Sequence, residues 1–170
     1  MTEKREYAIL AKGDNISRVW VCSMKLSTRG RYGTKVLLDL ALHQGTGPVS
    51  LKDVSKRQQI PLHYLEHLIA PLITGGIIRS SRGARGGISL VKPPAEIRLS
   101  EVIPLLEGSI APAECVANPE LCDNAASFVT RDVWREMESA MTGVLESITL
   151  QNLADRQKSK DQHKEKMYYI

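Results

Sequence analysis

The sequence predicts a mainly α-helical protein with a small β-hairpin, followed by a long C-terminal helix. Three observations predict this fold class. Apolar residues recur at helical spacing in the N-terminal half, two short β-prone runs ("GIIRSS" and "GGISLV") flank a tip rich in glycine and arginine, and a heptad pattern appears near the C-terminus. At 170 residues, the chain has the length of one domain with an extension.

Composition excludes several classes of protein. Apolar residues make up 42% of the chain, which is enough for a core, but no apolar run reaches the roughly 18 residues that span a membrane. The N-terminus lacks a signal-peptide pattern, and three cysteines do not form a secreted disulfide framework. We therefore expect a cytoplasmic protein. Residues 1–23 lack clear periodicity, and we interpret them as an N-terminal extension upstream of Met24.

The net charge of +4 hides a strong segregation of charge along the chain. Residues 24–98 carry twelve Lys and Arg against four Asp and Glu, a balance of +8, whereas residues 99–170 carry seven against twelve, a balance of −5. The basic part is therefore the natural candidate for a surface that binds a polyanion.

Two helices are predicted at the start of the basic part. The first runs over about residues 28–43, where apolar side chains recur at four-residue spacing, and Ser27 is placed to cap it. The second begins after Ser50, which caps it in a variant of the capping box, and ends near residues 57–59.

The segment "PLHYLEHLIAPLITGG" predicts a third helix, with Pro61 at its first position and an apolar stripe of leucine and isoleucine. Pro71 lies inside this segment. A proline in the middle of a helix costs about 3 kcal/mol and clashes with the carbonyl four residues back. We therefore expect a kink or an early end near Ala70.

The two β-prone runs predict a hairpin over about residues 77–91, with "RGARGG" at its tip. A nucleotide-binding phosphate loop joins a strand to a helix and is followed by Lys-Ser or Lys-Thr, which this loop does not do. After the hairpin, "RLSEVIPLLEG" predicts a short helix capped by Ser100. The segment 99–130 therefore combines this helix with an irregular stretch that contains Cys115 and Cys122.

This order of elements is the winged helix-turn-helix arrangement, which we assign to residues 24–98, with the helix-turn-helix over about 51–74. In this arrangement the third helix enters the major groove of double-stranded DNA, and the hairpin forms a wing beside it. Base edges are read by the polar face of the third helix, whereas cations near the start of the first helix bind phosphates. The predicted DNA-binding residues are Lys25, Arg29, Arg31, His63, Tyr64, Glu66, His67, Arg79, Arg82 and Arg85.

The C-terminal part predicts a dimerisation helix over residues 131–157 and a charged, disordered tail over 158–170. Apolar residues follow each other at spacings of three and four, which is a narrow seam that needs a partner helix. A homodimer would place two recognition helices about 34 Å apart, one turn of DNA. The predicted dimerisation residues are Trp134, Met137, Met141, Val144 and Ile148.

Residues 24–157 resemble the IscR-like family of winged-helix regulators, which includes the iron–sulfur cluster regulator, the cysteine-metabolism repressor and the nitric-oxide-sensitive repressor. The match is carried by "MKLSTRGRYG", "PVSLKDVSKRQQIPLHYLEHL", "GIIRSSRGARGGISL", "LSEVIPLLEG", "VW" and "ITLQNL". The resemblance implies a homodimer that binds palindromic promoter DNA, and we expect it to act as a repressor. It places His63 and Glu66 at recognition positions, His67 where the cluster regulator usually has Gln, and Arg82 at the minor-groove position of the wing.

The resemblance also implies a sensor, but this chain departs from the family pattern there. Cluster-binding members have three cysteines before the long helix. Cys115 and Cys122 match the first two, whereas the third position falls at Phe128 and the cluster regulator's histidine position at Arg131. Three interpretations of the two cysteines stay open: they hold a labile or bridging iron–sulfur cluster, they form a thiol–disulfide switch, or they have no sensing role.

Two functions from other classes also compete with a DNA-binding regulator. A redox or metal enzyme is disfavoured, because the sequence shows no nucleophile with a base and an orienting group, no Cys-x-x-Cys and no histidine-rich metal motif. We therefore expect no enzymatic activity. The other rival is a winged-helix module that docks an acidic protein partner through its basic wing. Within the class of regulators, the alternative is a winged-helix regulator with no cluster that responds to a protein partner or to thiol oxidation.

Overall fold

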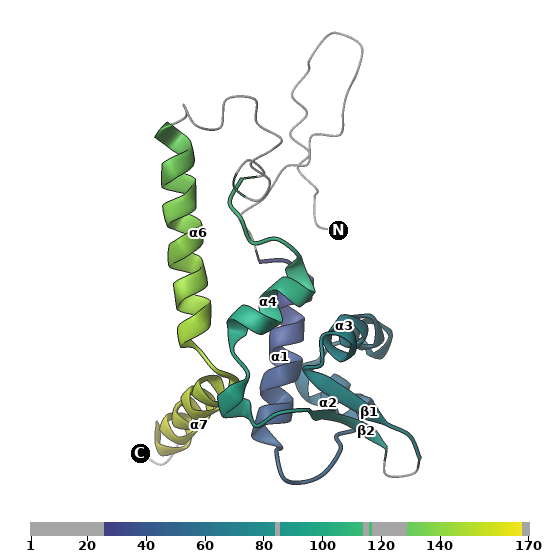
Figure 1. The fold of residues 1–170 in the computed structure, drawn as a ribbon. Coiled ribbons are helices and arrows are strands. Elements are labelled where there is room, and N and C mark those ends of the chain that lie inside the picture. The colour runs from purple at the N-terminus through teal and green to yellow at the C-terminus, as the bar shows by residue number, and fades with distance from the viewer. Residues whose placement is uncertain (1–25, 84–85, 114–115, 117–128, 168–170) are drawn as a thin grey trace, which may run out of the picture.

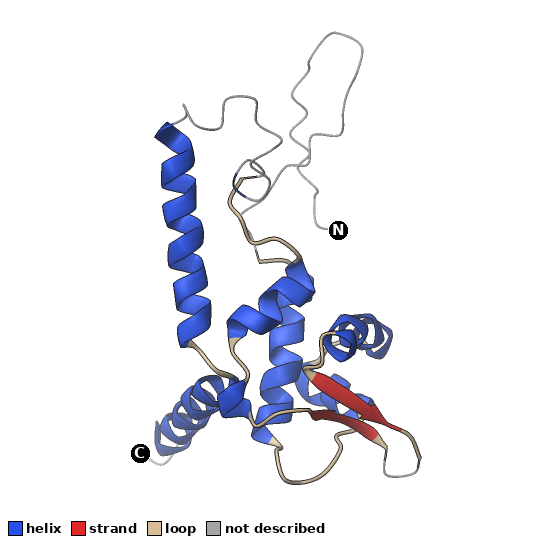
Figure 2. Cartoon of the chain, in the orientation of Figure 1, coloured by secondary structure: helices blue, strands red, loops and turns tan. Residues whose placement is uncertain are grey.

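A computed structural model describes residues 26–83, 86–113, 116 and 129–167 of the chain. Helices dominate it, and the strands form one small hairpin (Figures 1 and 2). No helix in these ranges is both long enough and apolar enough to cross a membrane. In chain order the elements are α1 (Thr28–Leu42), α2 (Leu51–Gln58), α3 (Leu62–Thr74), β1 (Ile78–Ser81), β2 (Gly87–Leu90), a short 3-10 helix η1 (Pro94–Glu96), α4 (Leu99–Glu107), α6 (Val129–Ser147) and α7 (Leu150–Met167).

The predicted N-caps of the first two helices are confirmed. The hydroxyl of Ser27 accepts hydrogen bonds from the backbone N–H groups of Arg29 (3.0 Å) and Gly30 (3.3 Å), and the hydroxyl of Ser50 accepts one from Lys52 (3.2 Å). Each cap satisfies backbone donors that have no partner inside the helix. Gln59 ends α2 with a left-handed backbone (φ 54°, ψ 43°), which turns the chain toward α3.

The start of α4 differs from the prediction, because Ser100 lies inside the helix and not at its cap. Arg98 occupies the capping position, and its backbone N–H donates to the Glu101 carboxylate (3.4 Å).

Of the two outcomes predicted at Pro71, a kink or an early end near Ala70, the early end is wrong, because α3 continues through Pro71 to Thr74. The early end was expected from the proline alone. Leu68 and Leu72, on either side of it, are fully buried, and this burial offsets the cost of the proline. The Pro71 carbonyl still accepts a hydrogen bond, from the Gly75 N–H (2.9 Å).

The wing is an antiparallel hairpin in which Ile78 lies opposite Leu90 and Ser81 opposite Gly87. Val49, in the loop before α2, pairs with Ile88 and extends the hairpin by one bridge. Ile78 and Ile88 are buried and hold the wing against the helices. The wing is therefore packed in place beside α3. Residues 84–85, at its tip, lie outside the described residues.

The C-terminal part corrects two predictions. The single dimerisation helix predicted over residues 131–157 is two helices, α6 and α7, that meet at an angle (Figure 1). The tail over 158–170, predicted to be disordered, is helical as far as Met167.

The break between α6 and α7 has a physical cause in tertiary pairing. Arg98 and Thr149 form an isolated β-bridge, with two backbone N–H···O bonds of 2.9 Å between residues 97–99 and 148–150. Thr149 also caps α7, since its hydroxyl accepts from the Asn152 N–H (3.2 Å) while its own N–H donates to the Asn152 side-chain oxygen (2.9 Å). Because the backbone groups of residues 148–150 make these bonds, they are not available for the hydrogen bonds of one continuous helix.

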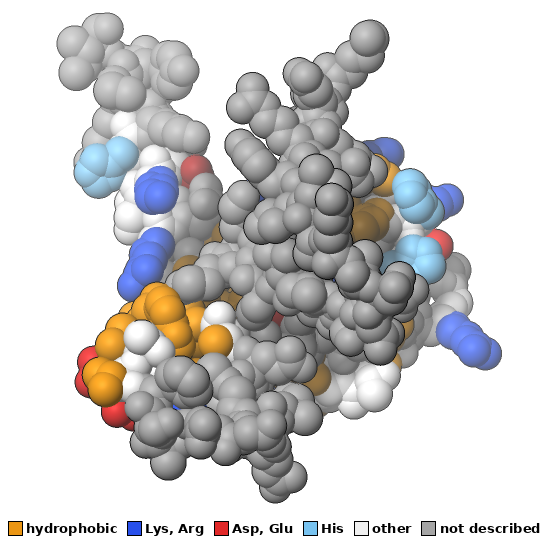
Figure 3. All heavy atoms as spheres, turned by 90° about the horizontal axis from the view of Figure 1, so that it is seen from above, with side chains coloured by type: hydrophobic (Ala, Val, Ile, Leu, Met, Phe, Trp, Pro, Cys, Tyr) orange, Lys and Arg blue, Asp and Glu red, His pale blue; other side chains and the backbone are white. Residues whose placement is uncertain are grey.

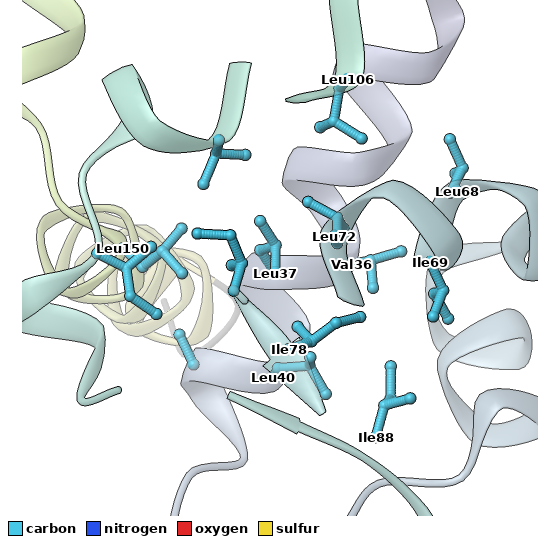
Figure 4. Close-up of a cluster of buried hydrophobic side chains, with 14 of the residues drawn as sticks. Val36, Leu37, Leu40, Leu68, Ile69, Leu72, Ile78, Ile88, Leu106 and Leu150 are labelled. Carbon is cyan, nitrogen blue, oxygen red and sulfur yellow. The ribbon is translucent and has the colours of Figure 1, made fainter. Parts of the chain in front are cut away.

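One apolar core joins α1, α3, the wing, α4 and the start of α7. Its side chains converge between these elements in Figure 4, where Leu150 of α7 lies on the same side of α1 as Leu37. The fully buried members include Val36, Leu37, Leu65 and Leu72. Helices α1 and α3, the wing and the start of α7 therefore share one packed interior.

Among the described residues, Asp39 of α1 is the charged residue that is buried in this core, and 1% of its surface is exposed. Its carboxylate accepts two hydrogen bonds from the Arg57 guanidinium (2.9 and 2.6 Å) and one from the Gln58 amide (3.0 Å). Burial raises the pKa of Asp39, but these hydrogen bonds and the charges of Arg57 and His43 outweigh burial and hold the pKa below its ordinary value. The network ties the middle of α1 to the end of α2.

We predict that Asp39→Ala lowers the free energy of unfolding by about 2 kcal/mol, because three donors lose a charged acceptor. The matched control is Glu96→Ala, which removes an exposed carboxylate. Urea unfolding followed by circular dichroism measures both, and equal losses would contradict the structural role of the network.

The difference in unfolding free energy between the wild type and Asp39→Ala should also depend on pH. A carboxyl whose pKa is depressed by folding stabilises the fold above its unfolded pKa of about 3.9, and this contribution disappears as the pH falls through the folded pKa. The difference in stability between the wild type and Asp39→Ala should therefore be full at neutral pH and shrink in the acid range below about pH 4. A difference that grows on acidification would have the wrong sign.

Candidate DNA-binding interface

The exposed face of α3 carries the polar side chains that the sequence predicts for base reading. His63, Glu66 and His67 are all exposed, whereas Leu65 and Leu68 between them are buried. The three side chains make no hydrogen bond or ion pair with any other residue that the structure describes. Figure 3 shows histidine, lysine and arginine side chains gathered on the side of the molecule where α3 lies. Among the described residues, none uses the donors and acceptors of this face.

Tyr64 was predicted to be a DNA-binding residue, and the structure places it in an intramolecular contact. Its side chain is half-buried, and its ring packs edge-on against Tyr32 of α1, with centroids 5.7 Å apart and planes at 86°. The Lys35 ammonium and the Arg31 guanidinium lie 5.8 and 6.0 Å from the Tyr32 ring centroid. Tyr64 therefore couples α3 to α1, beside two cations.

The first turn of α1 presents the predicted phosphate-binding cations. Arg29 and Arg31 are exposed, and Lys35 is exposed one turn further along the helix. Lys25, which was predicted to act with them, lies outside the described residues. The positive N-terminal end of the helix dipole adds to the positive potential at this end of α1.

The wing adds two described arginines to the basic surface. Arg79 of β1 is exposed, and its side chain donates a hydrogen bond across the hairpin to the Ser89 hydroxyl (3.1 Å). Arg82 is exposed just after β1, and Arg85 lies outside the described residues. The hairpin needs glycine near its tip, because Gly83 has a φ of 108° and a Cβ on Gly86 would overlap backbone of the preceding turn.

Sequence reasoning missed further residues beside this interface. Lys52 and Lys56 of α2 are exposed on the same helix-turn-helix, and the first helix of that motif crosses the DNA backbone. Both lysines lie on the polar face of the helix that the "SLKDVSKRQ" segment predicts, so the helical periodicity of this segment could have identified them as exposed. Arg57 has a different role, since Asp39 binds it.

Helix α6 carries four of the five predicted dimerisation residues, and none of the four is buried. No α6 residue is buried, and Val144 and Val129 are 58% and 79% exposed. Trp134 is also exposed, whereas Met137 and Met141 are half-buried. Figure 3 shows hydrophobic side chains gathered on the side of α6.

Ile148 differs from the other predicted dimerisation residues. It lies in the break between α6 and α7 and packs against the core of its own chain.

The predicted sensor cysteines, Cys115 and Cys122, lie outside the described residues, as does Phe128. Within the ranges that are described, no three His, Cys, Asp or Glu side chains gather closely enough to hold a metal ion.

Three comparisons with known proteins agree with this geometry. A model of the Rrf2 family, described as an iron-dependent transcriptional regulator, matches residues 26–156. Protein rrf2 of Nitratidesulfovibrio vulgaris is 43% identical over 130 residues, which is 76% of this chain and 87% of that protein. The HTH-type transcriptional regulator IscR of Photorhabdus laumondii is 39% identical over 138 residues, or 81% of this chain and 84% of that protein. The structure of CymR, the global cysteine regulator of B. subtilis, matches with a TM-score of 0.66 and 38% identity, covering 78% of this chain and 97% of that one.

Proposed function

Because the chain belongs to the Rrf2 family of transcriptional regulators, we propose that it is a sequence-specific DNA-binding repressor that acts as a homodimer on double-stranded promoter DNA. The observation that carries this proposal is the free polar face of α3, formed by His63, Glu66 and His67, beside exposed cations from α1 and the wing. This function needs access to the chromosome, so we propose that the protein acts in the cytoplasm, and that it has no catalytic role.

Each part of this surface suits a different feature of DNA. In the major groove, Glu66 would accept a hydrogen bond from a cytosine amino group, and His63 and His67 would pair with base edges. Arg82 suits the minor groove, where the negative potential is concentrated. Arg29 and Arg31 would bind phosphates, which fixes the register of the protein on the duplex without reading sequence.

We predict that binding to duplex DNA depends steeply on salt. If each dimer makes six or more phosphate contacts, affinity should fall about a thousandfold or more between 50 and 200 mM salt, because each contact releases counterions. Selection from a pool of random duplexes should return a two-fold symmetric site. A flat salt response and the absence of a consensus would together refute the proposal.

Two substitutions separate base reading from backbone binding. Arg82→Ala should weaken binding to the selected duplex, whereas Glu66→Ala should relax base preference at one position of each half-site by about 1–3 kcal/mol. Arg156→Ala and Glu96→Ala are the matched controls, because they remove exposed side chains of the same charge from α7 and η1. If Arg82→Ala binds the duplex like Arg156→Ala, and Glu66→Ala binds it like Glu96→Ala, in a gel-shift assay, the residue assignments fail.

We propose that a second copy of α6 covers the apolar surface of this helix. Side chains that repeat at spacings of three and four along α6 form a narrow seam, and seams of this kind pack against a partner helix. Val144 is 58% exposed and Trp134 36%, so both contribute apolar area that a partner helix could cover. Self-association through this seam would place two α3 helices on successive major grooves.

If the seam of α6 forms the interface of a homodimer, a charge placed in the seam should dissociate the dimer. Trp134→Glu should convert the dimer to a monomer at micromolar concentration, since an unpaired carboxylate would be buried in the interface. Arg135→Glu places the same side chain one residue further round the helix and should leave the dimer intact. Sedimentation velocity measures both, and a monomeric wild type or a dimeric Trp134→Glu variant would contradict the seam.

We propose that Cys115 and Cys122 regulate DNA binding through thiol oxidation. The donor set does not fit a cluster held by one chain, because four-ligand clusters prefer four thiolates and the segment before α6 supplies two, Cys115 and Cys122, with Phe128 and Arg131 at the other family positions. Joining the two sulfur atoms as a disulfide releases two protons and two electrons. A peroxide oxidant would accept both electrons and both protons and leave as water.

Oxidation of the purified protein by peroxide should remove two titratable thiols and change its affinity for the selected duplex, and thiol reductant should reverse both effects. Cys115→Ala should abolish the response, whereas Cys22→Ala, at the third cysteine of the chain, should not. Reconstitution with iron and sulfide without oxygen provides the test of the cluster interpretation. A stable sulfide-to-iron absorption band, or equal affinity in both oxidation states, would overturn the thiol proposal.

A further inference from the structure

The last turn of α4 lies against three glycines that belong to the DNA-binding helices or their ends. The contacting pairs are Leu105 with Gly75, Leu106 with Gly33, and Glu107 with Gly30. Gly75 follows α3, whereas the other two glycines belong to the first half of α1. Three consecutive residues of α4 therefore meet both helices that carry the candidate DNA contacts.

These contacts leave no space for a side chain on the glycines. A Cβ built on Gly33 would overlap the Leu106 side chain, and a Cβ on Gly75 would overlap Leu105. Leu106 is buried, so it has little room to move away. Because protein interiors transmit small displacements, the position of this turn of α4 determines how α1 and the end of α3 lie relative to each other.

Glu107 adds a polar contact to this packing. One of its carboxylate oxygens accepts hydrogen bonds from the backbone N–H of Ser27 (3.1 Å) and from the Ser27 hydroxyl (2.8 Å). Ser27 is the N-cap of α1, so the carboxylate lies at the positive end of the helix dipole. Figure 1 shows the C-terminal end of α4 beside the N-terminal end of α1.

The location of this carboxylate is unusual for a surface that binds a polyanion. Arg29 and Arg31, the candidate phosphate-binding residues, begin two residues after Ser27. A negative charge so close to them repels DNA, and its removal alone would strengthen binding. A role in positioning has the opposite consequence, because without the carboxylate the first turn of α1 would be released and the two arginines would be displaced.

We propose that Glu107 is a positioning residue for DNA binding: through Ser27 it holds the first turn of α1 in the place where Arg29 and Arg31 meet phosphates. This inference rests on the proposed function, since it concerns the same DNA surface. The turn of α4 formed by residues 105–107 is then the support for that surface from the side opposite the DNA.

The test measures the affinity of the full-length protein for the selected duplex as a function of salt. Glu107→Ala should weaken binding about tenfold and reduce the slope of log affinity against log salt by about one for each phosphate that the variant no longer binds. Glu107→Gln keeps a hydrogen-bond acceptor for Ser27 without the charge, so it should retain most of the affinity and the slope. Ser27→Gly, which preserves a good N-cap residue but removes the hydroxyl, should weaken binding in the same direction as Glu107→Ala.

The control is Glu101→Ala, which removes an exposed carboxylate from the first turn of the same helix. Among the described residues, this carboxylate pairs with Lys92 (3.6 Å) and with the Arg98 backbone. It reports the general effect of losing one negative charge and should not weaken binding. Thermal unfolding of each variant identifies any loss of the fold, and Ser27→Gly tests the contact independently if Glu107→Ala does not fold. If the wild type binds the duplex, the proposed function stands. Equal or tighter binding by Glu107→Ala than by the wild type, with an unchanged salt slope, would then overturn the inference alone. A wild type that ignores every duplex would overturn both.

Discussion

The buried carboxylate of Asp39 is the constraint on which the arrangement of the DNA-facing helices depends. A charge in a packed core is stable only when donors compensate it, and here the compensation comes from the end of α2, through Arg57 and Gln58. The turn that follows, with Gln59 in a left-handed conformation, leads directly into α3. The placement of α3, the proposed recognition helix, thus follows from an ion pair made one element earlier. It also withdraws one arginine from the basic surface, so net charge alone overstates the number of cations available to DNA.

Helix α1 has a different function on each of its sides. Its buried side contributes Val36, Leu37 and Leu40 to the core, and its glycines allow α4 to approach closely. Its exposed side presents arginines, and Tyr32 links it to Tyr64 of α3. A helix that contacts α2, α3, α4 and α7 at once has little freedom to shift. The cations near its N-terminus are therefore presented on a rigid support, which would lower the entropy lost on binding the phosphates proposed as their partners.

Much of this architecture could be predicted from local sequence, and the rest could not, for identifiable reasons. The caps at Ser27 and Ser50 and the hairpin around the glycines depend on neighbours within a few residues, so their patterns are visible in the chain. The continuation of α3 through Pro71 and the break at Thr149 depend on partners from distant elements. Tyr64 shows the same limit in the candidate site, since its ring is directed by Tyr32, 32 positions earlier. The face formed by His63, Glu66 and His67 was predictable because exposure on a helix follows its periodicity.

The bridge between Arg98 and Thr149 has a consequence for the geometry of target sites. It fastens the chain leaving the wing to the junction of α6 and α7, and Leu150 anchors that junction in the core. A pair of subunits joined through α6 would therefore have no hinge between the joining helices and the grooves they address. Each inserted base pair rotates one half-site by roughly a tenth of a turn relative to the other. If the described junction does not absorb this rotation, the spacing between half-sites would select among targets in addition to the bases.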